Sequence, residues 1–518
     1  MRPHVRNVGD HRRNIDGAVP IHHTHAVVIE IEQFHESPRS FGRTVLPRWR
    51  VAYLRRTSIL RPRRGRAIHT TVTRAQGRCA TLPAPSARRG RHSRREEGTL
   101  MTNSTTADMT ARWAWLREQT PALRNRIYMN CGFQGPMSQP VADAMHAWID
   151  RELSLGPTTR EVLEARRQLA TRYRELAAQL VGADPDEIAI TEHTTRGINV
   201  VTGGLSVEAD DGVVTSGIEH ASGMIPSYFL RERRGADMRI VPLSPEDSPG
   251  AMAERFAGVI DARTRLVLVS GVSYSTGQRL PIAELVSLAH RANPGARVLI
   301  DGAQTAGHEP IDVHASGVDA YAFPMHKWMC GPGGLGALYI RRDRIAEIDP
   351  AAVSGHAAAA WDFAGEFTPE RESIQKFELT TVSGVLLAGG VAAIEQYLAS
   401  GPEAVWERAR ALNRVAEQRL KRTGVTVISP SSEATRTGLF TFHTPSIPAA
   451  ALAYHLQQTA GIVCRGVREL DAVRLSLNAY NTEDEIERVA EVVEGALRDG
   501  VTPEAQAVAQ PAAGAVEP

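Results

Sequence analysis

The sequence is poor in cysteine and has no long hydrophobic run. Its four cysteines among 518 residues show no paired spacing and no CxxC, which excludes a disulfide framework and a zinc knuckle. Because no run of about 18 apolar residues occurs, the sequence predicts no membrane-spanning helix. The P-loop, HExxH and GxSxG motifs are also missing, so nothing indicates an NTPase, a zinc protease or an α/β-hydrolase.

Lysine is absent from residues 1–100, although this segment contains 21 Arg and only 7 acidic residues, a net charge of +14. The rest of the chain carries −12. An arm that binds nucleic acid would use arginine clusters such as residues 61–66 on phosphates, and a transit peptide would also be rich in Arg and poor in acids. A third interpretation, which we favour, is that translation starts at Met101. We expect residues 1–100 to be disordered, because their like charges repel each other and apolar periodicity is weak.

Helical and strand patterns alternate over residues 101–385. Helical spacing covers 141–155 and 160–181, and short apolar runs predict strands at 187–191, 212–216, 238–242, 264–270, 297–300, 320–323 and 337–340. This alternation predicts an α/β fold with a mainly parallel sheet and helices on both faces.

The pattern changes after about residue 385. Helices are predicted at 385–398, 402–423 and 482–497, and short strands at 425–429, 437–443, 461–464 and 473–476. We therefore expect a smaller α+β domain over residues 386–500. Residues 501–518, rich in Ala, Pro and Gln, are expected to be disordered.

Two strand ends in the larger domain carry an acid and a lysine. The run 298–301 ends in Asp301 and is followed by Gln304, and the run 320–323 is followed by His326 and Lys327. Open α/β sheets bind ligands at the carboxyl ends of their strands, so we expect these residues to meet. Each alone would be a helix cap or a solvated charge. Together they favour a pyridoxal phosphate (PLP) site, where a lysine forms a Schiff base and a carboxylate keeps the pyridine nitrogen protonated.

With these motifs the sequence resembles the class V aminotransferase family of fold-type I PLP enzymes, which includes cysteine desulfurases, isopenicillin N epimerases and cyst(e)ine C–S lyases. The resemblance covers about residues 124–497. Its closest local similarity is to the C–S lyases, in the segments Tyr128–Pro136, Ser275–Gln278 and His326–Pro332. It implies a large PLP-binding domain over residues 101–385, a cytoplasmic location and a homodimer with shared active sites.

The resemblance also implies which residues hold the cofactor. Thr194 and Thr195 begin a helix, whose amino end attracts anions, and would bind the phosphate; by residue type alone they are equally well explained as a helix cap. Thr381 would add a hydroxyl from the neighbouring subunit. His220 would stack on the pyridine ring and relay protons, Asp301 would pair with the ring nitrogen, and Gln304 would bond the phenolic oxygen. Arg474, and secondarily Arg465, would bind the substrate α-carboxylate, which suits a planar guanidinium.

Three features depart from the family pattern. Pro324 stands where many members have Ser or Thr, so one phosphate hydroxyl is missing and His326 becomes a candidate to replace it. Tyr274 stands where desulfurases have Asn. The segment 465–474 contains no cysteine and is too short for the loop that carries the desulfurase thiolate, while Cys464 is expected to pack inward as a small apolar residue. Persulfide chemistry on the protein is therefore disfavoured.

We expect an enzyme that joins an α-amino acid to PLP and removes its α-proton with Lys327 as the base. The favoured outcome is β-elimination of a sulfur group from cysteine, cystine or an S-substituted cysteine. A class V aminotransferase or an amino-acid epimerase would share the first steps and stays an alternative. A regulator of the PLP fold, with residues 1–100 as a nucleic-acid-binding arm, is the alternative that is not an enzyme, although nucleic-acid binding is disfavoured. No metal site is expected.

Overall fold

The computed structural model describes residues 106–508, from α1 (Thr106–Glu118) to α14 (Pro503–Val508). The expected disorder of residues 1–100 concerns a segment outside the described residues, and so does the part of the predicted C-terminal tail that follows residue 508. No helix within the described range combines the length and the apolar character needed to cross a membrane.

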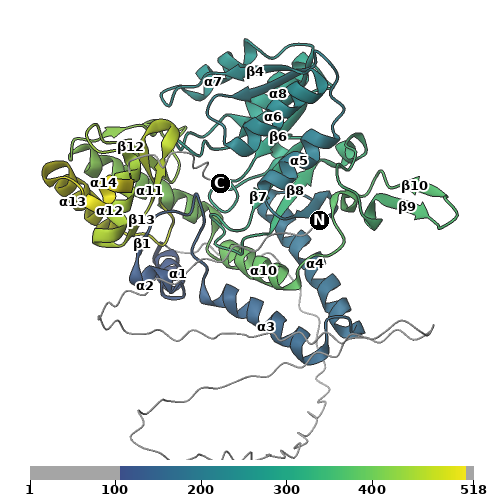
Figure 1. Ribbon diagram of the computed structural model, residues 1–518, viewed down its shortest axis with the longest axis horizontal. Helices are drawn as coiled ribbons and strands as arrows, with labels where there is room; N and C mark the ends of the chain where they lie inside the picture. The colour runs from purple at the N-terminus through teal and green to yellow at the C-terminus, as the bar shows by residue number, and fades with distance from the viewer. Residues whose placement is uncertain (1–105, 509–518) are drawn as a thin grey trace, which may run out of the picture. The chain divides into compact units, whose positions relative to one another are not determined.

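A seven-stranded sheet forms the centre of the larger part (Figure 1), in the order β2-β8-β7-β6-β5-β3-β4. Its parallel strands are β3 (Gly212–Ser216), β4 (Asp237–Val241), β5 (Thr264–Ser270), β6 (Arg297–Asp301) and β7 (Ala320–Pro324). The edge strand next to β8 is β2 (Ile188–Thr191), and β8 (Gly336–Ile340) runs antiparallel to both of its neighbours, β2 and β7. The prediction of a mainly parallel α/β sheet is confirmed.

Alternate residues of each central strand point to opposite faces of the sheet. On one face Leu266 and Leu268 of β5 pack in a core with side chains from α5 (Thr194–Gly204) and α6 (Ala221–Arg234). On the other face Val267 and Val269 pack with α4 (Arg160–Val181), α7 (Pro249–Ala257) and α8 (Ile282–Ala292). Helices cover both faces of the sheet, which explains why the sequences of these strands are continuous apolar runs.

The smaller part contains a four-stranded antiparallel sheet, in the order β11-β12-β15-β14. Its elements are β11 (Thr426–Val427), β12 (Leu439–His443), β14 (Arg465–Val467) and β15 (Ala472–Ser476), with α11 (Pro402–Lys421), α12 (Ala449–Ala460) and α13 (Glu483–Asp499) packed against them. Strand β1 (Ile127–Tyr128) pairs in parallel with β13 (Ile462–Val463), so a segment that precedes the larger part in sequence joins the smaller part.

Two boundaries differ from the prediction. Residues 386–500 were expected to form the smaller domain, but α10 (Gly384–Ala399) packs against α3 (Gln139–Leu155) and α4 of the larger part, and its Leu387 and Ile394 lie in that core. The expectation of disorder from residue 501 is wrong for residues 503–508, which form α14 against α12. Ala505 of this helix is fully buried, and the Thr502 N–H just before the helix donates to His455 Nδ1 of α12 at 3.2 Å. These contacts with α12 are not visible in the composition of the segment.

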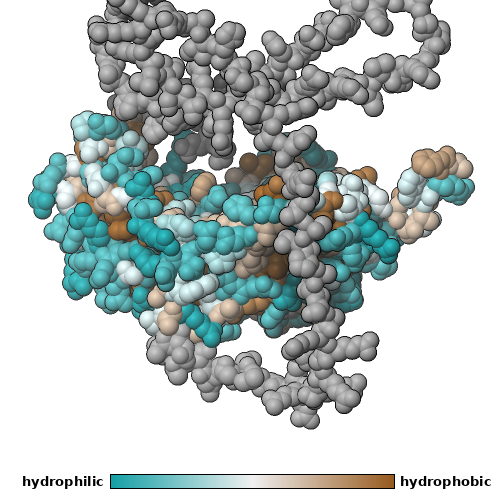
Figure 2. Space-filling model, turned by 90° about the horizontal axis from the view of Figure 1, so that it is seen from below, coloured by the Kyte–Doolittle hydropathy of each residue, from teal (hydrophilic) through white to brown (hydrophobic). Residues whose placement is uncertain are grey.

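A β-hairpin that the sequence patterns did not predict projects from the larger part (Figures 1 and 2). It consists of β9 (Ala358–Trp361) and β10 (Phe367–Pro369) in antiparallel pairing. Trp361 and Phe367 are 59% and 64% exposed, and Phe363 at the turn is 99% exposed. The strands are short and exposed, so they lack the alternation of apolar and polar residues by which a strand is recognised.

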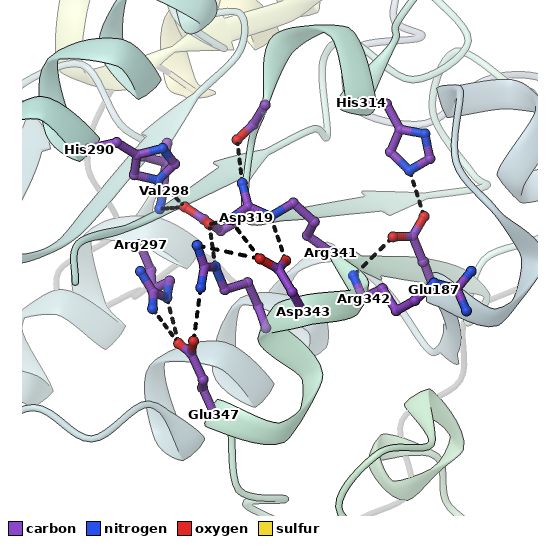
Figure 3. A network of polar contacts seen from close by, with 12 residues as sticks. Glu187, His290, Arg297, Val298, His314, Asp319, Arg341, Arg342, Asp343 and Glu347 are labelled. Atoms are coloured by element: carbon purple, nitrogen blue, oxygen red, sulfur yellow. Dashed lines mark hydrogen bonds and ion pairs between the residues drawn. The ribbon is translucent and has the colours of Figure 1, made fainter. Parts of the chain in front are cut away.

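The sheet edge that carries the strands' amino ends is held by a polar network around Asp319 (Figure 3). Its carboxylate accepts hydrogen bonds from His290 Nε2 and the Val298 N–H, each at 2.8 Å. Arg341 and Arg344 approach the other oxygen at 3.1 and 3.2 Å. These contacts connect β6, β7 and the end of β8, and so fix the strands whose opposite ends carry the candidate site.

Candidate active site

Three strands of the seven-stranded sheet end at the candidate site. Ser270 and Asp301 are the last residues of β5 and β6 and pair with each other, and Lys327 follows the end of β7. Lys327 interacts electrostatically with Asp301, Arg465 and Arg474. The structure therefore brings together an amine, a carboxylate and two guanidinium groups that lie up to 173 residues apart in sequence.

Lys327 sits on a loop that is tightly connected to the segment after β1. The Gly135 N–H donates to the His326 carbonyl at 2.7 Å, and a Cβ on Gly135 would lie 2.3 Å from the Lys327 carbonyl oxygen, so only glycine fits there. Burial, with help from the two arginines and against the effect of Asp301, lowers the pKa of Lys327 to about 8. A lysine with this pKa exchanges its proton near neutral pH.

The sequence contains only three lysines, and the other two have structural contacts. Lys376 is buried and donates to the carbonyls of Ile345 and Arg371 at 2.7 and 2.8 Å. Lys421 forms an ion pair with Glu417 on the surface of α11. Lys327 is therefore the lysine available at the carboxyl edge of the sheet.

Asp301 is buried, and its Oδ1 accepts the Ala303 N–H at 2.9 Å. A second carboxyl group, Glu219, lies near it and was not predicted from the sequence. Glu219 accepts hydrogen bonds from Ser216 Oγ at 2.5 Å and from the N–H and hydroxyl of Ser270 at 2.7 and 2.5 Å. Burial, together with repulsion from Asp301, raises the pKa of Glu219 to about 7. Its position directly before His220 was the only sequence signal for it.

The amino end of α5 has the features of a phosphate cradle. The Thr194 hydroxyl is buried and has no hydrogen-bond partner among the described residues. Thr195 Oγ1 donates to Ser222 Oγ at 2.8 Å. Because the first turn of a helix leaves backbone N–H groups unpaired, an anion is favoured here, and the orphaned hydroxyl of Thr194 fits a phosphate oxygen.

His220 caps α6 and lines a cavity of about 510 Å³ together with Thr195 and Ser222. Its Nδ1 accepts the Ser222 N–H at 3.1 Å, which leaves the proton of the neutral ring on Nε2. Burial and the neighbouring Lys327 lower the pKa of His220. Tyr274 meets the ring edge to face, with centroids 5.0 Å apart.

The three remaining predicted cofactor residues differ in burial and in their hydrogen-bond partners. Gln304 donates from Nε2 to the Gly132 carbonyl at 2.7 Å and accepts the Trp328 indole N–H at 2.9 Å, so its expected bond to the cofactor's phenolic oxygen depends on its second amide hydrogen. His326 Nδ1 is buried without a partner among the described residues, and burial and Lys327 lower the pKa of His326 to about 4. Thr381 is exposed on the segment before α10.

Arg474 is a buried cation, 1% exposed, in the middle of β15. Its NH1 donates to the Tyr274 carbonyl at 2.7 Å, whereas Nε and NH2 have no partner among the described residues. Burial and the nearby Arg465 lower the pKa of Arg474 below its usual range. Arg465 lies opposite it on β14, with its guanidinium 4.5 Å from the ring centroid of Phe133. A buried guanidinium with two free donor nitrogens is stabilised by a carboxylate ligand, because a carboxylate can accept hydrogen bonds from both nitrogens.

The connection between β14 and β15 is short and contains no cysteine. It consists of η5 (Arg468–Leu470) and Asp471, which adopts a left-handed backbone conformation with φ 42°. Cys464, just before β14, packs against the core of the smaller part as predicted. Burial raises the pKa of its thiol to about 12, so it is not a reactive thiolate at neutral pH.

A lysine, an acid, a phosphate cradle and a carboxylate-binding arginine at the carboxyl edge of this sheet define a fold-type I PLP enzyme. The model of the class V aminotransferase family matches residues 137–489. The chain belongs to the class V aminotransferase family and depends on PLP.

Similar proteins include a probable cysteine desulfurase of Methanothermobacter thermautotrophicus, 30% identical over 73% of this chain and 96% of its own length. A cysteine desulfurase of Enterobacter sp. strain 638 is 31% identical over 63% of this chain and 82% of its own. Among solved structures, the cystine C–S lyase C-DES in complex with its reaction product cysteine persulfide is similar with a TM-score of 0.68 and 29% identity, covering 73% of this chain and 99% of that one.

Proposed function

We propose that the protein is a PLP-dependent C–S β-lyase that acts on cysteine, cystine or an S-substituted cysteine. The observation that carries the proposal is the buried guanidinium of Arg474 beside Lys327, whose Nε and NH2 have no partner among the described residues. An α-amino acid is a ligand that satisfies both groups, because its carboxylate pairs with the guanidinium while its α-carbon lies toward the amine. Arg465 is the second candidate for this carboxylate.

Each side chain of the site has a proposed role in binding PLP or in the β-elimination. Bound PLP supplies a ring that accepts electrons and stabilises negative charge at the α-carbon. Thr194, Thr195 and His326 would hold the phosphate, His220 would cover the ring, and Asp301 would keep the pyridine nitrogen protonated. Lys327 Nζ removes the α-proton, which its lowered pKa permits near neutral pH. A sulfur group on Cβ then leaves with its bonding electrons.

Two observations favour a lyase over a desulfurase, which transfers sulfur to a protein thiolate. The short β14–β15 connection has no cysteine, and the thiol of the partly buried Cys464 has a raised pKa. The similarity to the cystine C–S lyase also supports a lyase. Release of pyruvate and ammonia is therefore expected, with sulfide from cysteine or a persulfide from cystine.

We further propose a homodimer with shared active sites. The cavity beside His220 has a rim of exposed Ile225 and Phe229, each about half exposed, which a second subunit would cover. Thr381 is exposed and free to contact the phosphate of a partner. The apolar tip of the β9–β10 hairpin would bury its aromatic side chains in the same assembly (Figure 2).

Incubation of the purified protein with a panel of amino acids tests the function. Pyruvate and sulfide from cysteine, or pyruvate and persulfide from cystine, are the expected products. Alanine with protein-bound persulfide would indicate a desulfurase, a keto acid that retains the side chain an aminotransferase, and a D-isomer an epimerase. Each of these results would replace the lyase assignment.

A chain beginning at Met101 separates the enzyme from the regulator alternative. The enzyme proposal expects this shortened chain to keep PLP and lyase activity. A gel shift of nucleic acid that depends on residues 1–100, with no turnover of any amino acid, would favour the regulator.

A further inference from the structure

Two cysteines that the proposed reaction does not use, Cys131 and Cys330, lie in contact beside the site. Both are buried, at 0% and 7% exposure, in a cluster that includes Trp328 and Tyr480. Their thiols interact as hydrogen-bond partners. Cys131 Sγ also lies 2.6 Å from the Tyr480 hydroxyl and 3.7 Å from Asn478 Nδ2. Two adjacent thiols can join as a disulfide, which a lone buried cysteine cannot do.

The two cysteines belong to different parts of the molecule. Cys131 follows β1, which pairs with β13 of the smaller part. Cys330 lies three residues after Lys327, on the loop that follows β7 of the larger part, and its N–H donates to the Lys327 carbonyl at 3.0 Å. A bond between the two sulfurs would therefore connect both parts covalently, next to the lysine proposed to carry the cofactor.

The backbone at Cys330 is strained. Its φ is 54°, in the left-handed region that a residue with a side chain rarely occupies. Such a conformation costs about 1–3 kcal/mol and persists where the surroundings impose it. Here hydrogen bonds to the Lys327 and Met325 carbonyls, from the N–H groups of Cys330 and Gly331 at 3.0 and 2.9 Å, hold the backbone in this conformation. The Cys330 thiol also lies 3.7 Å from the Trp328 carbonyl oxygen.

We propose that Cys131 and Cys330 form a reversible disulfide, with a small peroxide as the oxidant. The Cys131 thiolate attacks one oxygen of hydrogen peroxide, which breaks the O–O bond, forms a sulfenic acid and releases hydroxide. The Cys330 sulfur then displaces the sulfenic hydroxyl, which leaves as water with the proton of that thiol. Two electrons pass from the sulfurs to the peroxide, and a thiol reductant returns them.

The acidities of the two thiols agree with these roles. Burial opposes ionisation of Cys131, but hydrogen bonds from Cys330, Tyr480 and Asn478 outweigh it and lower the pKa of Cys131. The interaction with Cys131, followed by burial, raises the pKa of Cys330 well above its usual range. Because the Tyr480 hydroxyl and the Asn478 amide surround the Cys131 sulfur, we assign Cys131 as the attacking thiolate and Cys330 as the resolving thiol.

The disulfide would act on the site through the Lys327 loop. Closing the S–S bond withdraws Cys131 from the Tyr480 hydroxyl and pulls Cys330 toward the segment after β1, which already contacts this loop through the Gly135 N–H. Displacement of Lys327 by about 1 Å is sufficient to cost about a hundredfold in rate. Oxidised enzyme is thus expected to lose activity and to recover it on reduction.

Peptide mapping of the full chain tests the proposal independently of the reaction catalysed. After treatment with hydrogen peroxide and alkylation of the remaining thiols, mass spectrometry should find the peptides of Cys131 and Cys330 linked, with the loss of two hydrogen atoms, and dithiothreitol should separate them. Cys464→Ser should still form this link, whereas Cys131→Ser and Cys330→Ser should not.

The mapping of the unsubstituted chain decides the question even if one of these variants fails to fold. Oxidation confined to Cys464 or Cys79, irreversible sulfinic acid at Cys131 without a link, or two alkylated thiols after peroxide treatment would each overturn the pair. Failure of the proposed lyase reaction would leave this measurement unaffected.

Discussion

Arg465 and Arg474 are directly paired residues of the antiparallel strands β14 and β15. Paired residues in such strands project to the same face of the sheet, where like charges destabilise each other. Arg474 also keeps two buried donor nitrogens without a partner among the described residues. This repulsion and the two unsatisfied donors cost free energy in the free protein. A bound anion removes both costs, so the site favours an anionic ligand.

The first prediction concerns this anion site. Replacing Arg474 by Ala removes a charged hydrogen bond worth roughly 1.5–3 kcal/mol, so KM for the amino acid should rise by about ten- to a hundredfold. Steady-state kinetics measure the change. Arg488→Ala on the surface of α13 is the matched control and should leave KM unchanged. An unaltered KM for Arg474→Ala would place carboxylate binding elsewhere.

The second prediction concerns the lysine that binds PLP. Lys327→Ala should lack the yellow absorbance of lysine-bound cofactor and should show no label after borohydride reduction. Lys421→Ala, which removes an exposed lysine of α11, should keep both signals. Persistence of a reducible chromophore in Lys327→Ala would show that another amine carries the cofactor.

The third prediction is a pH dependence. Only the neutral amine of Lys327 reacts with PLP, so incorporation of PLP into the apoprotein should slow as pH falls through about 8, the lowered pKa of Lys327. Absorbance after mixing gives the rate at each pH. Arg465→Gln removes a neighbouring positive charge and should move the midpoint upward. A midpoint near 10.5 in the unsubstituted protein, the ordinary value for lysine, would contradict the burial of this amine.

The strands and helices of the larger part could largely be predicted because both faces of its sheet are covered. Continuous apolar runs such as 264–270 coincide with β5, and helical spacing over 160–181 coincides with α4. The β9–β10 hairpin was missed because it buries too little to leave an apolar pattern. The boundary at residue 385 was misplaced because the apolar face of α10 does not reveal which of the two parts it covers.

The approach of Asp301 and Lys327 could be predicted because Asp301 ends β6 and Lys327 follows β7 at the same edge of the sheet. Contacts between distant loops had no such signal. The Ser270 hydroxyl that bonds Glu219 and the Gly132 carbonyl that occupies Gln304 depend on chain segments that meet only in the fold. Sequence spacing therefore indicated which chemistry to expect, while the hydrogen-bond partners that constrain each side chain required coordinates.

The fourth prediction concerns stability at the opposite edge of the sheet. Burial acts to raise the pKa of Asp319, but hydrogen bonds from His290 and the Val298 N–H, with the charges around it, lower the pKa. A lowered carboxyl pKa stabilises the fold above the unfolded value of 3.8, and this contribution is lost as pH falls below that value. Asp319→Asn should cost roughly 1.5–3 kcal/mol near neutral pH, since it removes a buried charged acceptor from the hydrogen bonds with His290 and Val298 and from the ion pairs with the half-buried Arg341 and Arg344.

Thermal unfolding at several pH values measures this effect. The difference in Tm between the native chain and Asp319→Asn should be large at pH 7 and should shrink as the pH falls below about 3.8, where the unfolded chain takes up the proton first and the native carboxylate follows at lower pH. Asp343→Asn, which removes a more exposed carboxylate of the same network (Figure 3), is the control and should change Tm little. A constant difference across the acid range would mean that Asp319 acts through packing and not through charge.

The last prediction concerns the proposed dimer and the hairpin tip. Phe363 is 99% exposed and contacts Trp361 in a T-shaped arrangement, with ring centroids 5.2 Å apart. Exposed aromatic side chains at the end of a projecting arm are costly in water and favourable when a partner buries them. Phe363→Ser should weaken self-association, which sedimentation equilibrium measures as a higher dissociation constant. Val508→Ser, an exposed apolar position on α14, should leave association unchanged. A dimer of undiminished affinity in Phe363→Ser would exclude the arm from the interface and leave the exposed rim of Ile225 and Phe229 as the surface to test next.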